Sequence, residues 1–147
     1  MKIEDTDDME QMRGITVSRD WNHAHEKLIA RYKRVAKAFA ERNPGKTLLV
    51  TCTYRSPEYQ QKLFKKGRFG NPGPIVTQLD GKNKLSKHNA FPSLALDVCV
   101  LFGGKAVWDE REYWDILPLC EENNLVSGGK WSRFPDWPHI QLPEEQK

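Results

Sequence analysis

The 147-residue sequence has no run of 18 apolar residues, which is about the length that a transmembrane helix needs. Its first twelve residues, MKIEDTDDMEQM, are polar and lack the apolar core of a secretory signal peptide. We therefore expect a protein that is made in the cytoplasm, is soluble there and carries no membrane anchor.

Cysteine is scarce as well. The three cysteines stand at positions 52, 99 and 120, and no two of them form a CxxC pair. Each lies in an apolar stretch, where a buried thiol behaves as a small hydrophobic side chain. The sequence indicates no disulfide framework, which favours synthesis in a reducing compartment.

Charge is nearly balanced, with a formal net charge of only +3. Basic residues cluster in 31–42 and 62–68, and a small nucleic-acid-binding protein is one hypothesis for them. Such clusters along a helix are usually a solvated face, so we expect no nucleic-acid partner. A chain of 147 residues with 38% hydrophobic residues is large enough to fold around one core, so we expect a single domain over 1–147. Residues 1–17 are expected to form a less ordered N-terminal segment, and the protein is expected to be a monomer.

Hydrophobic periodicity and turn residues predict helices and strands in an irregular order. Apolar side chains recur every three or four residues from Leu28 to Phe39, within a predicted helix over 18–42, and Gly103-Gly104 predicts a tight hairpin. The other predicted elements are strand 47–53, helix 57–66, a long loop 68–84, strand 93–102, helix 109–124 with a break at Pro118, and a final strand after Pro138. Because these elements do not repeat as βαβ units, we predict an α+β fold with a small, mainly antiparallel sheet and flanking helices.

Four histidines offer few ways to build a metal site. His23 and His25 stand two residues apart on the predicted helix and face different directions, so they are poor ligands. His88 and His139 instead lie at loop–strand junctions rich in Gly, Pro and aromatic residues. A zinc hydrolase needs three protein ligands and an open position for water, and Asp97, inside an apolar strand, is the third candidate.

Each candidate also has an ordinary structural interpretation. A buried Asp97 could pair with an arginine or cap backbone amides, and His88 could simply belong to a turn. Arg55, at the end of the first strand, is placed either to reach a substrate carbonyl or carboxylate or to form a salt bridge. Asp136, three residues before His139, is placed either to take a proton from water activated by the metal or to form a turn.

Six short segments together resemble one known family. They are TYRSPEYQ at 53–60, GR at 67–68, SKHN at 86–89, PSLALDV at 92–98, GGKW at 128–131 and DWPHIQL at 136–142. Their order is similar to that in the zinc D,D-peptidases and L,D-endopeptidases of the VanY and phage endolysin type, the peptidase M15-like family. The resemblance implies a compact α+β fold shared with the hedgehog signalling domain.

The resemblance also implies a role for each matching residue. Zinc would bind His88, Asp97 and His139; Asp136 would be the general base and acid; and Arg55 would stabilise the oxyanion. One departure concerns spacing, because eight residues separate His88 from Asp97 where six are usual in the family. The longer segment around Phe91-Pro92 must therefore return both side chains to one metal.

Residues for substrate binding are implied with less detail. Ser86 would form a hydrogen bond near the metal or the substrate. Trp131 and Trp137 would line the substrate cleft together with Phe134, although tryptophans of a small core would give the same sequence pattern.

The activity implied by the resemblance is that of a zinc metallopeptidase acting on peptidoglycan. Aspartate at position 136, where the D,D-dipeptidases have glutamate, resembles the phage L-alanyl-D-glutamate endopeptidases, so the expected target is the L-Ala–D-Glu bond of murein stem peptides. The expected setting is a phage or prophage endolysin that stays in the host cytoplasm until a holin releases it to the periplasm and cell wall. The alternatives are a D,D-carboxypeptidase or dipeptidase acting on D-Ala-D-Ala, and a catalytically silent, hedgehog-like module that binds zinc.

Overall fold

The computed structural model describes residues 17–133 and 135–144. In chain order the elements are η1 (Trp21–His23), α2 (Glu26–Arg42), β1 (Lys46–Cys52), α3 (Pro57–Lys65), η2 (Lys87–Asn89), β2 (Ala95–Phe102), β3 (Lys105–Val107), η3 (Glu110–Tyr113), α4 (Ile116–Glu122), β4 (Val126–Ser127), η4 (Gly128–Lys130) and β5 (His139–Gln141), where η marks a 3-10 helix. The strands form one antiparallel sheet in the order β1-β2-β5-β4, and β3 pairs with β2. The predicted α+β fold is confirmed.

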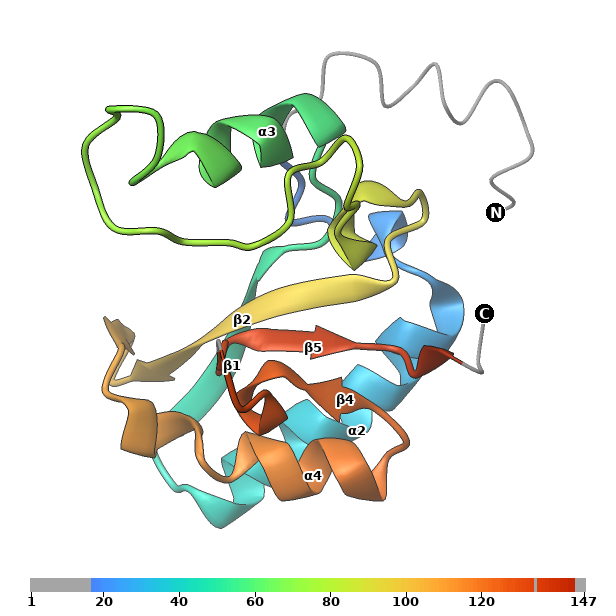
Figure 1. Cartoon of the computed structure of the whole chain (residues 1–147). Helices are drawn as coiled ribbons and strands as arrows, with labels where there is room; N and C mark the ends of the chain where they lie inside the picture. Colours follow the sequence, from blue (N-terminus) through green and yellow to red (C-terminus); the bar gives the residue numbers. More distant parts are fainter. Residues whose placement is uncertain (1–16, 134, 145–147) are drawn as a thin grey trace.

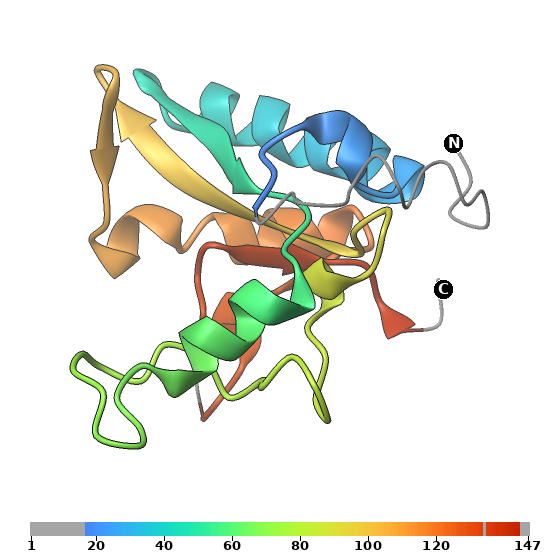
Figure 2. The same ribbon diagram turned by 90° about the horizontal axis from the view of Figure 1, so that it is seen from above.

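The helices lie on two sides of this sheet. Figure 1 shows α2 and α4 below the sheet, and α3 with the loop that follows it above the sheet. Seen from above in Figure 2, α2 and α3 are at opposite sides of the molecule. The main hydrophobic core lies between the sheet and the helices α2 and α4, whereas the candidate functional residues face α3.

The alternation of side chains along β2 explains this division. Leu96, Val98 and Val100 are buried in the main core together with Tyr32 and Ile116 from the helices. Because successive side chains of a strand point to opposite faces, the residues between them point to the side of the sheet that carries α3. A strand that is apolar on one face therefore presents functional groups on the other.

Helix α2 begins later than the sequence predicted. Its buried residues Leu28, Tyr32, Val35 and Phe39 are those of the predicted stripe, but its first residue is Glu26 rather than Ser18. Upstream of it, the backbone of residues 23–25 bonds to Ser93, as His25 N donates to Ser93 O and Ser93 N donates to His23 O. These bonds use groups that a continuous helix would need for itself, and His25 instead caps α2 by accepting from Lys27 N.

The turns and later elements agree more closely with the prediction. Gly103 and Gly104 have positive φ values of 58° and 79°, as a two-residue hairpin between β2 and β3 requires. The predicted helix 109–124 is divided into η3 and α4, and the division falls before Ile116 rather than at Pro118. Pro118 is the third residue of α4, where no N–H is required for the helix.

The N-terminal segment predicted over 1–17 lies outside the described residues except for Val17, which pairs with Arg55 in an isolated antiparallel bridge. Among the described residues, no helix is both long and apolar enough to cross a bilayer.

Candidate metal centre

Three neighbouring strands bring Cys52, Asp97 and His139 into one row. The register pairs Asp97 of β2 with Cys52 of β1 on one side and with His139 of β5 on the other. An irregularity in β1 between Val50 and Cys52 sets the first of these pairs. Directly opposed residues share a face of the sheet, so the three side chains project to the same side.

His88 reaches the same place from η2, outside the sheet. The hydroxyl of Ser86 accepts from His88 N at 3.1 Å, and Asn89 Oδ1 accepts from Ser86 N at 2.8 Å, which together form a capping box. Arg55 N also donates to His88 O at 2.9 Å. The short helix is thereby fixed to the end of β1, and the imidazole of His88 is only 1% exposed.

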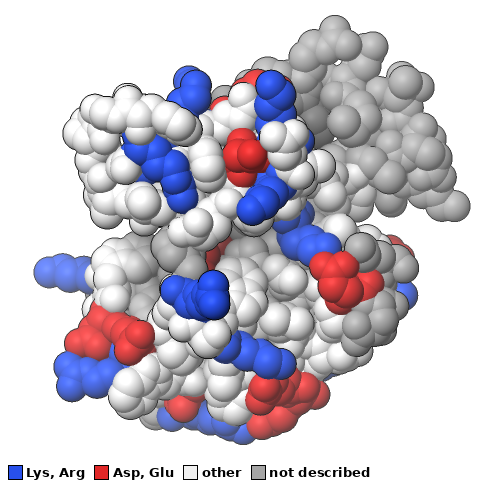
Figure 3. All heavy atoms as spheres, in the orientation of Figure 1, with Lys and Arg blue, Asp and Glu red and all other residues white. Residues whose placement is uncertain are grey.

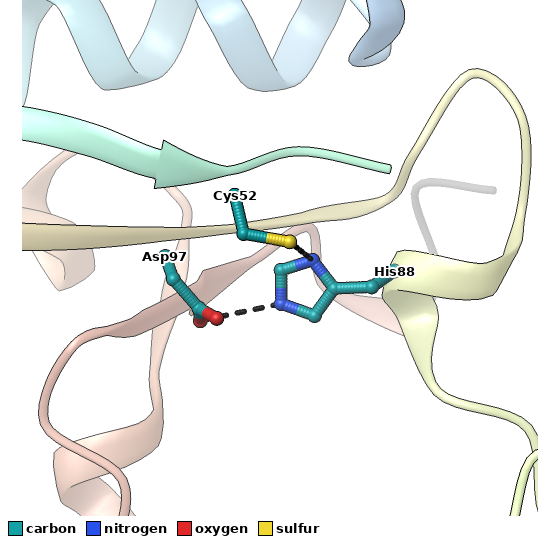
Figure 4. Close-up of side chains that lie close together, drawn as sticks. All are labelled: Cys52, His88 and Asp97. Carbon is teal, nitrogen blue, oxygen red and sulfur yellow. Dashed lines mark hydrogen bonds and ion pairs between the residues drawn. The ribbon is translucent and has the colours of Figure 1, made fainter. Parts of the chain in front are cut away.

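The two histidines and Asp97 converge on one carboxylate oxygen. His88 Nε2 lies 3.2 Å from Asp97 Oδ1, and His139 Nδ1 lies 3.5 Å from the same atom. Figure 4 shows one ring nitrogen of His88 facing Asp97 and the other facing Cys52. The structure therefore brings together the three residues that the sequence predicted as zinc ligands.

The longer spacing between His88 and Asp97 does not separate them. The buried Phe91 packs edge-on against Tyr54, with ring centroids 5.9 Å apart, and against His23 at 5.5 Å. The extra residues are thus absorbed in a small cluster beside the site, and the chain returns at Ala95 to enter β2.

Hydrogen bonds fix which nitrogen of each histidine faces Asp97. His88 Nδ1 lies 2.8 Å from Thr53 O, which can only accept, so Nδ1 carries the proton in the neutral ring. His139 Nε2 lies 2.8 Å from Gln141 Oε1, which likewise accepts. The lone pairs of His88 Nε2 and His139 Nδ1 therefore point towards Asp97 Oδ1.

Three acceptors that face one another at these distances require a positive charge between them. Histidine nitrogens and a carboxylate oxygen are ligands that zinc favours, and bonds from the outer nitrogens to carbonyl oxygens are the usual support for zinc-binding histidines. His88, Asp97 and His139 thus fit the zinc ion that the resemblance implies. Carbonyl oxygens, however, are weaker supports than carboxylates would be.

The pKa shifts of His88 and Asp97 also indicate that a positive charge is favoured at this place. Burial lowers the pKa of His88, but the Asp97 carboxylate favours the imidazolium more strongly, and the net shift is upward. Burial raises the pKa of Asp97, but the two histidines lower it further, to well below its usual range. In the absence of a metal ion, a proton on the histidine pair would supply the positive charge beside Asp97.

Cys52 is a neighbour of the site that the sequence did not indicate. Its Sγ lies 3.7 Å from His88 Nδ1, and Cys52, His88 and Asp97 offer ligand atoms that all lie within 4.8 Å of one another. The thiol is buried and lies next to His88 Nδ1 in Figure 4. Only the register of β1 on β2 brings it there, and nothing in the local sequence specifies that register.

Arg55 binds the other oxygen of Asp97. Its Nη2 donates to Asp97 Oδ2 at 3.1 Å, and its Nη1 donates to Gln60 Oε1 at 2.9 Å. The salt bridge considered as an alternative from sequence is therefore present. It uses Oδ2 and leaves Oδ1 to the histidines, so the two interpretations of Asp97 are compatible.

Asp136 lies beside this cluster on the segment before β5. Asp136, Asp97 and His139 offer ligand atoms within 4.8 Å of one another. Gly128 O accepts from Asp136 N at 2.9 Å, and a Cβ on Gly128 would lie 2.3 Å from Asp136 O, so only glycine allows this approach. Burial and the nearby Asp97 charge raise the pKa of Asp136, which is a property of general bases and acids.

A cavity of about 790 Å³ opens above the cluster. Its lining includes Arg55, His88, Asp97, Asp136 and His139, so all the residues predicted for metal binding and catalysis border it. Figure 3 shows a hollow between the part of the molecule that carries α3 and the part that carries the sheet, with acidic atoms inside and basic side chains around it. A volume of this size accommodates a short peptide.

The residues predicted to bind substrate are placed differently from one another. Ser86 and Trp131 line the cavity, and the Trp131 ring lies 5.0 Å from the His139 ring. Trp137 does not line it, because its ring packs against the main core and Gly129 while its Nε1 donates to Glu110 Oε1 at 2.8 Å. The structure gives Trp137 the core role that the sequence left open, and Phe134 lies outside the described residues.

The chain is similar in sequence to one curated peptidoglycan peptidase and in fold to two solved peptidases, which agrees with the resemblance found in the sequence. The sequence matches no protein-family model. It is 29% identical over 113 residues to the peptidoglycan L-alanyl-D-glutamate endopeptidase CwlK of Bacillus subtilis. This match covers 70% of the chain and 65% of CwlK, slightly less than two thirds of that protein.

Two solved structures share the fold. The Serratia marcescens L-Ala D-Glu endopeptidase ChiX superposes with a TM-score of 0.58 and 22% identity, over 94% of this chain and 87% of ChiX. The LD-carboxypeptidase LdcB superposes with a TM-score of 0.50 and 18% identity, over 88% of this chain and 70% of LdcB. At these identities the similarity concerns the fold alone.

Proposed function

We propose that this protein is a zinc-dependent peptidoglycan peptidase that cleaves the L-Ala–D-Glu bond of murein stem peptides. The observation that carries the proposal is the convergence of His88 Nε2 and His139 Nδ1 on Asp97 Oδ1, with Asp136 beside them at the base of a peptide-sized cavity. The sequence similarity to CwlK, a peptidoglycan L-alanyl-D-glutamate endopeptidase, supports the choice of substrate and bond.

His88, Asp97 and His139 would hold the zinc ion. When bound, zinc supplies a Lewis acid that polarises a carbonyl and makes water more acidic. Asp97 also keeps Arg55 at the site through its second oxygen. The Asp97 carboxylate would therefore bind the metal through one oxygen while it binds the Arg55 guanidinium through the other.

Asp136 is the proton carrier in this mechanism. Its partly buried carboxylate accepts a proton from the attacking water and delivers it to the amine that leaves. A raised pKa suits both steps, because the group must gain and lose the proton within one turnover. Arg55 lines the same cavity, and N–H groups of its guanidinium stabilise the negative charge that develops on the carbonyl oxygen.

The proposed biological setting is lysis of a bacterial cell. We place the enzyme, as a monomer, in a phage or prophage lysis system in which a holin releases it from the host cytoplasm to the cell wall. Expression in a bacterial host tests this setting: lysis should follow when a holin is co-expressed, and not when the enzyme is expressed alone. Lysis at equal rates in both cultures would contradict it.

Mass spectrometry of digested muropeptides tests the activity. An L-Ala–D-Glu endopeptidase releases the stem peptide without its first alanine, whereas a D,D-carboxypeptidase releases only D-alanine. The expected result is the first product, formed by zinc-loaded protein and not after chelation. Release of D-alanine alone would show that the protein is a D,D-carboxypeptidase instead. Zinc binding without any product would favour the catalytically silent module that binds zinc.

A further inference from the structure

Gln60 of α3 is a fully buried polar side chain whose hydrogen bonds all lead towards the site. Its exposed fraction is 0%, and it is not among the residues that line the cavity. Gln60 Oε1 accepts from Arg55 Nη1 at 2.9 Å. Gln60 Nε2 donates to Thr77 Oγ1 at 3.2 Å and to Leu79 O at 2.9 Å. The amide thus connects Arg55 to the loop that follows α3.

The loop segment that Gln60 holds is a wall of the cavity. Residues 76–79 all line it. A second side chain, Arg68, holds the same segment, because its Nη1 donates to Thr77 O at 3.0 Å and its Nη2 to Gln78 Oε1 at 3.3 Å. Among the described residues, Arg68 forms no hydrogen bond with Arg55. Of these two side chains, only Gln60 therefore contacts both the wall and the guanidinium.

The site is built closely around Gln60. Gly81 has a φ of 75°, and a Cβ there would lie 2.6 Å from Pro57 O and 2.8 Å from Gln60 Cβ. The loop therefore passes directly over the helix at the position of Gln60. A glutamine suits this place because its amide offers one acceptor for the arginine and donors for the loop.

We propose that Gln60 is a positioning residue that sets the orientation of the Arg55 guanidinium and the place of the 76–79 wall together. Arg55 in turn binds Asp97 Oδ2 at 3.1 Å, so the contact reaches the carboxylate that faces both histidines. The consequence for turnover rests on the proposed function; the consequence for the structure does not.

Three variants separate the two contacts. Gln60→Glu keeps an acceptor for Arg55 and loses the N–H donated to Leu79 O. Gln60→Leu has a similar size and loses both contacts. Arg68→Gln is the matched control, because it weakens the wall and leaves Gln60 with Arg55.

The structural readout is independent of activity. In Gln60→Leu, the side-chain N–H signals of Arg55 in NMR spectra should broaden or exchange faster, and backbone amides of 77–79 should exchange faster with solvent. In Gln60→Glu and Arg68→Gln, the amide exchange should rise while the Arg55 signals stay as in the wild type. Thermal unfolding of each variant reports whether it is folded.

The kinetic readout is a split between kcat and KM on a stem peptide. Gln60→Leu should lower kcat by about 10- to 100-fold, as loss of a supporting contact around a metal site typically does. Gln60→Glu should keep most of kcat and raise KM, and Arg68→Gln should behave in the same way. If Gln60 served only to fill space, glutamate would not restore the kcat that leucine loses.

Two results would overturn the inference. One is a folded Gln60→Leu protein whose Arg55 signals and kcat equal those of the wild type. The other, which decides the matter if the leucine variant does not fold, is a Gln60→Glu protein with wild-type amide exchange at 77–79 or with disordered Arg55 signals. If the wild type itself cleaves no stem peptide, the proposed function fails, and the NMR measurements still decide the role of Gln60.

Discussion

At the scale of single residues, the site depends on the carboxylate of Asp97. One oxygen binds Arg55, and the other faces His88 and His139. A buried charge of this kind is stable only while its partners remain, because removal of one partner leaves the other charges uncompensated. Each partner therefore affects both the metal and the fold, whereas Asp136, which is not proposed as a ligand, can be tested for chemistry alone.

Replacement of Asp136 by asparagine separates proton transfer from metal binding. Asp136→Asn keeps the size of the side chain and removes the group that takes up the proton. We expect kcat/KM on a stem peptide to fall by about 100-fold or more, the usual contribution of a general base. Zinc content, measured by elemental analysis, should stay at the wild-type value. Asp109→Asn, a change of the same kind at an exposed N-cap, is the control and should leave turnover unchanged.

Stability of the metal-free protein should depend on pH through His88. The pKa of His88 rises from 6.5 to about 10 on folding, because the Asp97 charge outweighs burial. A raised folded pKa gives stability that is fully present below 6.5 and is lost as the pH rises to about 10. Thermal unfolding with a chelator present should therefore occur at lower temperature as the pH is raised through this range.

Zinc should change the sign of that dependence. Metal ligands must be deprotonated, so the stabilisation by added zinc should grow as the pH rises. A His88→Gln protein should lose both effects. An unfolding temperature of the metal-free wild type that rises with pH across the same range would contradict the pairing of His88 with Asp97.

The sequence revealed some residues of the site and not others for a definite reason. His88, Asp97 and His139 could be found because histidines are few and a carboxylate inside an apolar strand is unusual. Cys52 and Gln60 could not be found in this way. A cysteine in an apolar strand and a glutamine in a helix are ordinary, and their contacts depend on strand register and on the path of the 68–84 loop.

At the scale of elements, the short helix η2 is the part of the fold that orients His88. The reciprocal pair of Ser86 and Asn89 caps it. Three residues of 3-10 helix have little stability of their own. The cap, the bond from Arg55 N to His88 O and the contact of His88 Nδ1 with Thr53 O therefore determine where the imidazole lies.

Loss of this cap should weaken zinc binding. Ser86→Ala removes the acceptor of His88 N and should lower the free energy of unfolding by about 1 kcal/mol. Zinc affinity, measured by competition with a chelator, should fall as well. Asp109→Ala removes the equivalent cap of η3, where Asp109 accepts from Arg111 N, and should leave zinc affinity unchanged. Equal loss of affinity in the two variants would mean that η2 does not orient the ligand.

The differences between predicted and observed elements have the same origin. The apolar stripe from Leu28 to Phe39 determined the face and the end of α2, since both follow from local spacing. Its start did not follow, because the bonds between residues 23–25 and Ser93 join segments about 70 positions apart. Strand β2 was predicted with the correct end and a start only two residues early, because its apolar run is long and its hairpin glycines are local signals.

At the scale of the whole molecule, the distribution of charge matters more than the net charge of +3. The base of the cavity carries Asp97 and Asp136, and its margin carries Lys66 and Arg133. Lys66 follows α3 and Arg133 follows η4, so the two cations stand on different walls. Neither forms an ion pair within the described ranges 17–133 and 135–144, so both are available to a substrate.

Neutralising these two cations should weaken substrate binding without slowing the chemical step. Murein stem peptides carry carboxylates, which the margin would attract. In the double variant Lys66→Gln and Arg133→Gln, KM for a stem peptide should rise by roughly tenfold, as for two exposed charge pairs, while kcat is kept. Added salt should raise KM of the wild type more than that of the variant, because it screens exposed charges.

The control for this prediction is a double variant that removes the same number of positive charges at positions away from the cavity. Lys37 of α2 and Lys105 of β3 do not line the cavity, and α2 lies on the opposite side of the sheet from α3. Lys37→Gln with Lys105→Gln should leave KM and its salt dependence at wild-type values. If this pair raised KM as much as the marginal pair, attraction would come from the overall charge. If neither pair changed KM, the walls would recognise the peptide through Trp131 and the backbone instead.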